Sequence, residues 1–257
     1  MRKILTVAVS TTMFLFVGSV VAQDDEELTW VPVEAYACNF NDGKGPADLA
    51  AVVAEWNEWM DDEGQTEYFA ITLWPSYYGE RNFDVGWLGS WPNGNAMGAG
   101  TDYWLQHGQE MGAKFYEVLD CSAHTNFATA QLIDPGGEPV QNGDTFVLSF
   151  SNCSFTEDGG GMEGYLEASA QWEAYAGEHG FTGGDWMMFP TFGENVEADY
   201  DFKAVGSSKD YTAMGANWQL FAEGHWRKSS ELFDPVVDCD SARVYTAMVE
   251  RTRADGE

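Results

Sequence analysis

The sequence predicts an α+β protein made of two consecutive β-α-β-β-α-β units, whose sheets pack together as a barrel-like pseudo-dimer. Three observations support this fold: an internal repeat of about 115 residues, the same order of predicted strands and helices in both halves, and four cysteines at matching positions. A period of this length is that of a small domain rather than of a solenoid repeat. We therefore expect a first unit over residues 28–132, a turn-rich linker over 133–143 and a second unit over 144–252.

The repeat is visible in the spacing of particular residues. Cys38 precedes Trp56 by 18 residues, and Cys153 precedes Trp172 by 19. Further matches follow in the same order in both halves: Leu73-Trp74-Pro75 with Met188-Phe189-Pro190, Leu88-Gly89-Ser90 with Val205-Gly206-Ser207, Ala96-Met97-Gly98 with Ala213-Met214-Gly215, and His107 with His225, each 14 residues before a cysteine. Matches in one shared order indicate that the two halves have one architecture.

The first half supplies the pattern of elements. Alternating residues predict a strand from Trp30 to Phe40. A helix follows, with Pro46 suited to its first turn and apolar residues at helical spacing up to Met60. The rest of this half predicts strands over 67–74 and 83–88, a helix over 102–119 and a strand over 123–132. The second half repeats this order.

The order of elements also predicts how the cysteines pair. A β-α-β-β-α-β order is the split βαβ, or ferredoxin-like, motif, in which the last strand lies beside the first. The end of the first strand then meets the start of the fourth, which is where the cysteines lie. Of the three pairings that four cysteines allow, this topology favours Cys38 with Cys121 and Cys153 with Cys239. A metal site built from cysteines is the alternative, but the chain has no Cys-x-x-Cys pair.

The N-terminal residues predict export. Arg2 and Lys3 precede an apolar run from Ile4 to Val21, and Ala22 separates this run from an acidic stretch. This is the pattern of a cleavable signal peptide over residues 1–22, with an uncleaved membrane anchor as the alternative. We expect a secreted or periplasmic protein, without a membrane attachment after cleavage, in surroundings where disulfides persist.

The composition narrows the choice of partners. The chain has 12 Lys and Arg against 42 Asp and Glu, a formal net charge of -30. Such a field repels polyanions, so nucleic-acid binding is disfavoured outright. It suits cationic partners or a well-hydrated surface. Aromatic residues make up 15% of the chain, which separates it from disordered proteins.

Two ferredoxin-like units in one chain resemble the dimeric α/β-barrel superfamily, in which two such units close into a barrel. The resemblance rests on element order and duplication over nearly the whole chain after the signal peptide, and no motif of a particular member family is matched. It implies a site between the sheet and the helices of each unit. The superfamily includes haem-degrading monooxygenases, chlorite dismutase-like enzymes, quinone-forming oxygenases and lactone isomerases. Haem is therefore a cofactor that the resemblance suggests, whereas the residues themselves predict none.

Aromatic residues and two histidines form the candidate site. The matched His107 and His225 suit a ligand or acid–base role, and in related haem enzymes a histidine from the same general region holds iron. Packing on an aromatic stripe of a helix is the alternative for both. The aromatic residues either line a pocket or fill a core. The predicted ligand-binding set comprises Trp74, Tyr77, Trp87, Trp91, His107, Phe189, Phe192 and His225.

Three functions follow from these features. The first is binding of a small apolar or aromatic ligand in an aromatic-lined pocket, placed in the first half because that half is richer in tryptophan. The second is that of an oxygenase or haem-linked oxidoreductase. The third is a non-catalytic module whose acidic surface meets cationic partners. The residues predict no metal site, no catalytic residue and no oligomeric state.

Overall fold

A computed structural model of the chain describes residues 28–194 and 198–254, so the predicted signal peptide over 1–22 lies outside the described residues. In the first half the elements are β1 (Trp30–Phe40), α1 (Pro46–Asp62), β2 (Phe69–Tyr77), β3 (Val85–Ser90), α2 (Gly94–His107), α3 (Gln109–Val118) and β4 (Leu119–Ile133). In the second half they are β5 (Thr145–Phe155), α4 (Gly161–His179), β6 (Asp185–Phe192), β7 (Phe202–Ser208), α5 (Tyr211–Leu220), the π-helical turn η1 (Phe221–His225), α6 (Trp226–Phe233), β8 (Val237–Cys239) and β9 (Arg243–Arg251). No helix in these described ranges is long and apolar enough to cross a membrane.

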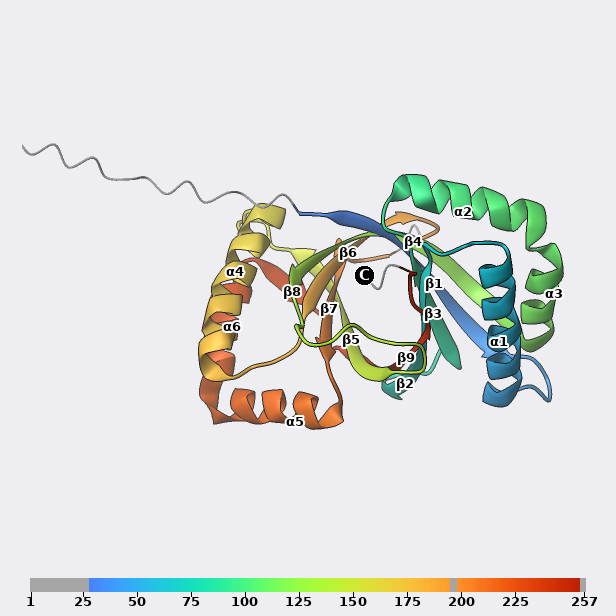
Figure 1. Cartoon of the computed structure of the whole chain (residues 1–257). Helices are drawn as coiled ribbons and strands as arrows, with labels where there is room; N and C mark the ends of the chain where they lie inside the picture. The colour runs from blue at the N-terminus through green and yellow to red at the C-terminus, as the bar shows by residue number, and fades with distance from the viewer. Residues whose placement is uncertain (1–27, 195–197, 255–257) are drawn as a thin grey trace, which may run out of the picture.

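Within the described chain, eight strands close into one antiparallel barrel with helices on its outside (Figure 1). The first half contributes the strand order β4-β1-β3-β2 and the second half β9-β5-β7-β6. β2 pairs with β9, and β4 pairs with β6, so the outer strands of each half bond to those of the other. The α+β class and the barrel are confirmed. The predicted packing of two separate sheets is replaced by edge-to-edge pairing, which leaves no outer strand of either half unpaired.

The predicted helix over 102–119 is wrong in its bounds, because α2 and α3 form there instead. α2 begins earlier, since the side chain of Asn93 caps it by accepting hydrogen bonds from the amides of Asn95 and Ala96. The chain turns at Gly108, where an added Cβ would lie 2.4 Å from the ring of Trp104. Glycine is therefore required at the junction. The apolar residues predicted to lie on one face of a single helix are divided between α2 and α3.

The interior of the barrel is packed with apolar side chains. All eight barrel strands contribute to this cluster, which includes Val33, Ile71, Leu88, Phe127, Leu148, Met188, Val205 and Ala247. Interiors of eight-stranded barrels are commonly filled in this way. A ligand site must therefore lie outside the barrel, between the strands and the helices.

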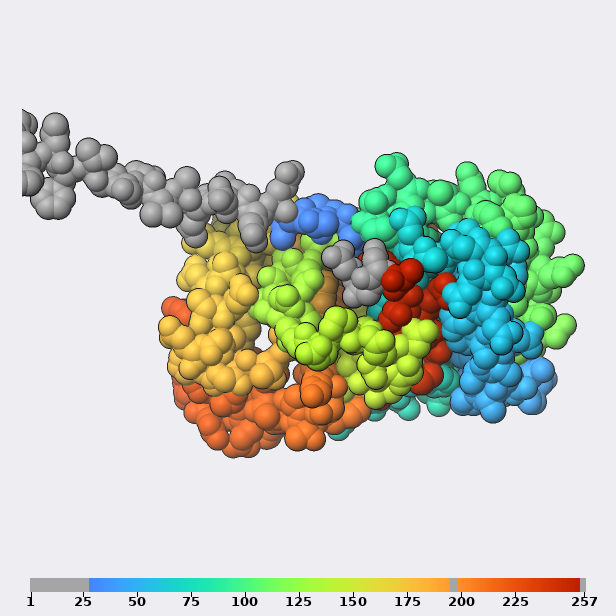
Figure 2. Space-filling view, in the orientation of Figure 1, coloured from blue at the N-terminus to red at the C-terminus, as the bar shows by residue number. Residues whose placement is uncertain are grey.

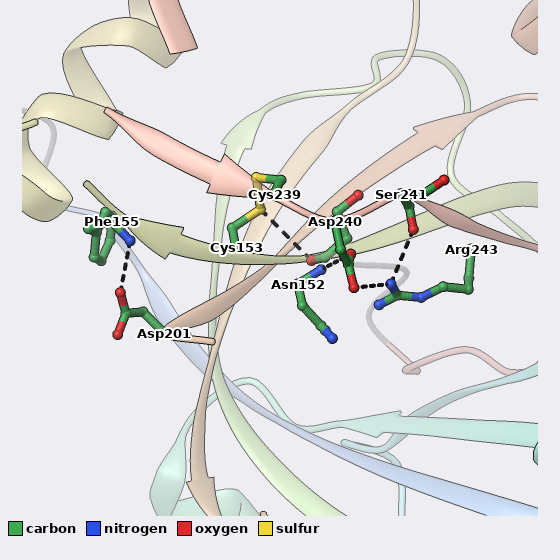
Figure 3. The surroundings of a disulfide bond; sticks show 9 residues. Asn152, Cys153, Phe155, Asp201, Cys239, Asp240, Ser241 and Arg243 are labelled. Atoms are coloured by element: carbon green, nitrogen blue, oxygen red, sulfur yellow. Dashed lines mark hydrogen bonds and ion pairs between the residues drawn. A yellow bond between two sulfur atoms is a disulfide. The ribbon is translucent and has the colours of Figure 1, made fainter. Parts of the chain in front are cut away.

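Both predicted disulfides are present. Cys38 pairs with Cys121 and Cys153 with Cys239, each bridge joining residues that lie opposite each other on neighbouring strands. Beside the second bridge, the carboxylate of Asp201 accepts a hydrogen bond from the backbone amide of Phe155 at 2.8 Å (Figure 3). Asp84 accepts from Phe40 in the same way at 3.1 Å in the first half. This match between the halves was not part of the predicted repeat.

Candidate functional site

Each half has a space between its strands and its helices. We call the space between β4-β1-β3-β2 and helices α1, α2 and α3 the first layer. We call the space between β9-β5-β7-β6 and α4, α5, η1 and α6 the second layer. The two layers differ in how completely side chains fill them, and this difference locates the candidate site.

The first layer is filled by one continuous aromatic core. Trp56 of α1 lies at its centre, with ring centroids 5.9 Å from Tyr68, 5.3 Å from Trp87 and 6.4 Å from Phe115. Trp91 is buried in the same cluster, where its ring centroid lies 4.7 Å from that of Tyr68. This core of aromatic side chains connects the strands to the helices continuously, so the first layer leaves no room for a ligand.

A hydrogen-bond network completes the first layer. Glu34 accepts from the hydroxyl of Tyr68 at 2.5 Å and contacts Nε2 of His124 at 2.9 Å. The indole of Trp87 donates to the Tyr68 hydroxyl at 3.1 Å. Burial, and then the negative charge of Glu34, raise the pKa of Tyr68, which keeps it a neutral donor. A Cβ on Gly89 would lie 1.7 Å from the Tyr68 hydroxyl oxygen, so even one added methyl group does not fit.

In the middle of the β5–β7 pair the second layer carries smaller side chains than the first, whereas Phe202 and Met187 are larger than their first-layer counterparts Val85 and Thr72. Strand pairing makes the comparison direct, because the same register occurs in β1–β3 and in β5–β7. On the helix-facing side, the first pair of strands has Glu34 opposite Gly89 and Tyr36 opposite Trp87, whereas the second has Ser149 opposite Gly206 and Ser151 opposite Ala204. The large groups of the first layer have no counterparts at these positions.

In the second layer, α5 lies over β5 and β7 but buries none of its own side chains. No residue of α5 is buried, although α5 contains Met214 and Leu220, and its Trp218 is 69% exposed. The apolar residues of this half form two clusters, one centred on Phe202 and one on Trp172, instead of one. Figure 2 shows gaps between the atoms of α4 and those of α5 and the neighbouring strands. The side chains of the second half thus pack less continuously than those of the first.

Asp185 and Ser149 face this space from the strands. A Cβ on Gly206 would lie 3.0 Å from Oγ of Ser149 and 3.4 Å from Oδ1 of Asp185, so both oxygens lie on the helix-facing side of that glycine. The Ser149 hydroxyl donates a hydrogen bond to the carbonyl oxygen of Gly206 at 3.3 Å. Burial raises the pKa of Asp185 to about 6. The charge of Asp185 in turn contributes, after burial, to a raised pKa of Tyr165 on α4. These groups form the polar floor of the second layer.

A tyrosine and two histidines lie where α4 meets η1. The hydroxyl of Tyr175 is 2.6 Å from Nδ1 of His225, and Nδ1 of His179 is 2.7 Å from the carbonyl oxygen of Tyr175. The rings of His179 and His225 are 4.8 Å apart. Gly224, with a φ of 117°, lets the chain turn just before His225.

The structure separates the residues of the predicted ligand-binding set. Trp74, Trp87 and Trp91 belong to the filled first layer, whereas Phe189 packs with Phe155 and Phe202 in the core of the second half. Tyr77 is 61% exposed and Phe192 is 68% exposed. His107 is exposed and its ring contacts that of Tyr103 at a tilt, and His225 lies at the margin of the second layer.

Residues that the sequence reasoning missed form the polar groups of both layers. Glu34, Tyr68 and His124 make the network of the first layer, and Ser149 and Asp185 make the floor of the second. The feature of the sequence that could have identified these residues was a charged or polar side chain at a strand position that faces the helices. In the described residues, no group of three or more His, Cys, Asp or Glu is arranged to hold a metal ion.

Comparison with known proteins identifies the fold. No known protein-family profile matches the chain, and no curated protein is similar to it in sequence. A provisionally named monooxygenase from Fusobacterium nucleatum superimposes with a TM-score of 0.53 at 10% identity, covering 87% of this chain and 94% of that one. A provisionally named chlorite dismutase superimposes with a TM-score of 0.51 at 13% identity, covering 89% of this chain and 98% of that one. A second provisionally named monooxygenase, from Lactobacillus acidophilus, superimposes with a TM-score of 0.50 at 13% identity, covering 87% of this chain and 95% of that one.

At these identities the likeness is one of fold. The chain has the dimeric α/β-barrel fold, with both ferredoxin-like strand orders in one polypeptide. The predicted resemblance is thus confirmed at the level of the fold.

Proposed function

We propose that this is an exported protein, formed by tandem duplication of a ferredoxin-like unit, that binds a small apolar or aromatic ligand in its second layer. The duplication is supported by equivalent contacts in the two halves. Asp84 and Asp201 bond equivalent strand amides, and Asn93 and Asp210 cap α2 and α5 by accepting from Ala96 and Ala213. Export is supported by the two disulfides, which suit an oxidising environment.

The observation that carries the proposal is the contrast between two equivalent helices. Met97 of α2 packs against the core of the first layer, whereas Met214, its counterpart in the repeat, belongs to none of the clusters that the described residues form. Apolar side chains of α5 that join no core cluster leave apolar surface that a ligand can cover. The ligand is thus assigned to the second half, beneath α5, and not to the tryptophan-rich first half.

Filling the second layer tests this assignment. Ala204→Trp places in the second layer the side chain that Trp87 places in the first. Calorimetric titration with 1-naphthylmethanol, a neutral aromatic probe, is expected to show one site per chain in the parent protein and at least a tenfold loss of affinity in Ala204→Trp. Ala216→Trp, at an exposed position on α5, is the control and keeps the parent affinity. Equal binding by all three proteins would contradict the proposal.

Haem binding is a second candidate, supported by the position of His225. If the tautomer with a proton on Nδ1 donates to Tyr175, Nε2 of His225 keeps a free lone pair that suits iron. The named chlorite dismutase of the same fold is a further reason to consider it. The carboxylate of Asp185 on the floor fits an apolar porphyrin face poorly, which ranks this candidate second. Haem added to the parent protein would give a Soret band that His225→Ala abolishes and that His107→Ala preserves; no band in the parent removes the candidate.

A further inference from the structure

We infer that the ligand of the second layer carries a cationic group, and that Asp185 is the residue that binds it. This inference rests on the proposed function, because it assigns a ligand class to the same space. The reason is that the second layer holds a carboxylate for which the described protein supplies no cation and no hydrogen-bond donor.

The position of Asp185 gives it access to a ligand. It lies at the start of β6, opposite Gly206 of β7, and its Oδ1 lies close to Gly206 on the side that faces the helices. The side chain is partly accessible and not sealed among apolar groups. Ser149 adds a hydroxyl beside it. A ligand beneath α5 would thus meet a carboxylate and a hydroxyl at one point of the floor.

The charges around Asp185 leave it unpaired. The charge of Asp185 adds to the effect of burial in raising the pKa of Tyr165 on α4, so the hydroxyl of Tyr165 is neutral. Tyr175, His179 and His225 lie at the α4–η1 end of the layer, where they contact one another. The lysine of β7 is Lys203. Its ammonium group lies over the ring of Phe127 in the barrel interior and donates a hydrogen bond to Asn152. None of these groups neutralises the carboxylate.

The carboxylate of Asp185 is partly withdrawn from water, and a cation that pairs with it offsets the cost of that desolvation. The net charge of -30 acts in the same direction, because it concentrates cations near the protein and repels anions. For ligands with the same aromatic body, affinity should thus follow the order cation, neutral molecule, anion.

Three probes that share a naphthalene ring separate these effects. 1-Naphthylmethylamine is a cation at neutral pH, 1-naphthylmethanol is neutral and 1-naphthoate is an anion. By calorimetry at pH 7.5, the cation is expected to bind the parent protein at least tenfold more tightly than the alcohol, and the anion more weakly than both. In Asp185→Asn the cation and the alcohol bind alike. Asp158→Asn, which neutralises an exposed aspartate of the same half, is the control and keeps the tenfold preference.

The pH dependence supplies a second readout. The carboxyl of Asp185 loses its charge as the pH falls through about 6, so the preference for the cation should disappear between pH 7.5 and pH 5 in the parent protein. Asp185→Asn should show no such change.

The outcomes distinguish this inference from the proposed function. If the alcohol binds and the cation binds no more tightly, Asp185 is not the anchor, while the binding site in the second layer stands. If the cation preference persists in Asp185→Asn, the general acidic field causes it and the inference is overturned. If none of the three probes binds the parent protein, the proposed function fails, and this inference fails with it.

Discussion

Gly89→Ala is expected to lower the free energy of unfolding by about 3 kcal/mol, because overpacking a filled core forces neighbouring groups to move. The new methyl group would lie 1.7 Å from the hydroxyl oxygen of Tyr68, a buried residue that is bonded to Glu34. Gly206→Ala is the matched substitution in the second half. It should change the free energy of unfolding by less than about 1 kcal/mol, since its methyl group meets only movable side-chain atoms at 3.0 and 3.4 Å.

Denaturant unfolding of both variants and of the parent protein measures these changes. The comparison is informative because both glycines occupy equivalent positions in the strand register of the two halves, so a general cost of replacing strand glycine affects them equally. Equal destabilisation of the two variants would contradict the view that the first layer is filled and the second is not.

Removal of the second disulfide by Cys153→Ala and Cys239→Ala is expected to lower the free energy of unfolding by about 4.5 kcal/mol. The bridge joins residues 86 apart in sequence, and such a cross-link restricts the unfolded chain. The double substitution Cys38→Ala and Cys121→Ala removes the first disulfide, which joins residues 83 apart in sequence. It should lower the free energy of unfolding by nearly as much. Losses of this size consume much of the stability of a typical domain. The protein would then be poorly suited to a reducing compartment.

Thermal and denaturant unfolding of the two double variants, with the reduced parent protein for comparison, checks this expectation. A change below about 1 kcal/mol in both would indicate that the bridges add little and would remove one support for export.

Strands and cross-links were predictable because they follow local rules. β1 runs from Trp30 to Phe40 as predicted, since alternation of side chains between two covered faces gives a clear period. The cysteine pairing followed from the position of the fourth strand beside the first. The bounds of α2 failed because its start depends on the capping side chain of Asn93 and its end on the contact of Gly108 with Trp104, neither of which a hydrophobic stripe shows.

The candidate site was not predictable from residue type. Trp87 and Trp91 have the side chains that ligand pockets favour, but the same side chains also fill cores, and here they fill the first layer. The opposite signal, small residues at equivalent positions such as Ser149 and Ala204, has meaning only when the two halves are compared strand by strand. Asp185 could be found only once its strand was known to face helices.

The central claim is that the second layer, and not the first, has room for a ligand. A crystal structure of the protein grown with 1-naphthylmethylamine tests it directly. Density is expected for the naphthalene ring between α5 and Gly206, with the ammonium group at the carboxylate of Asp185. Density for the probe among Trp87 and Trp91, or a second layer closed by α5 packed directly on Gly206, would contradict it.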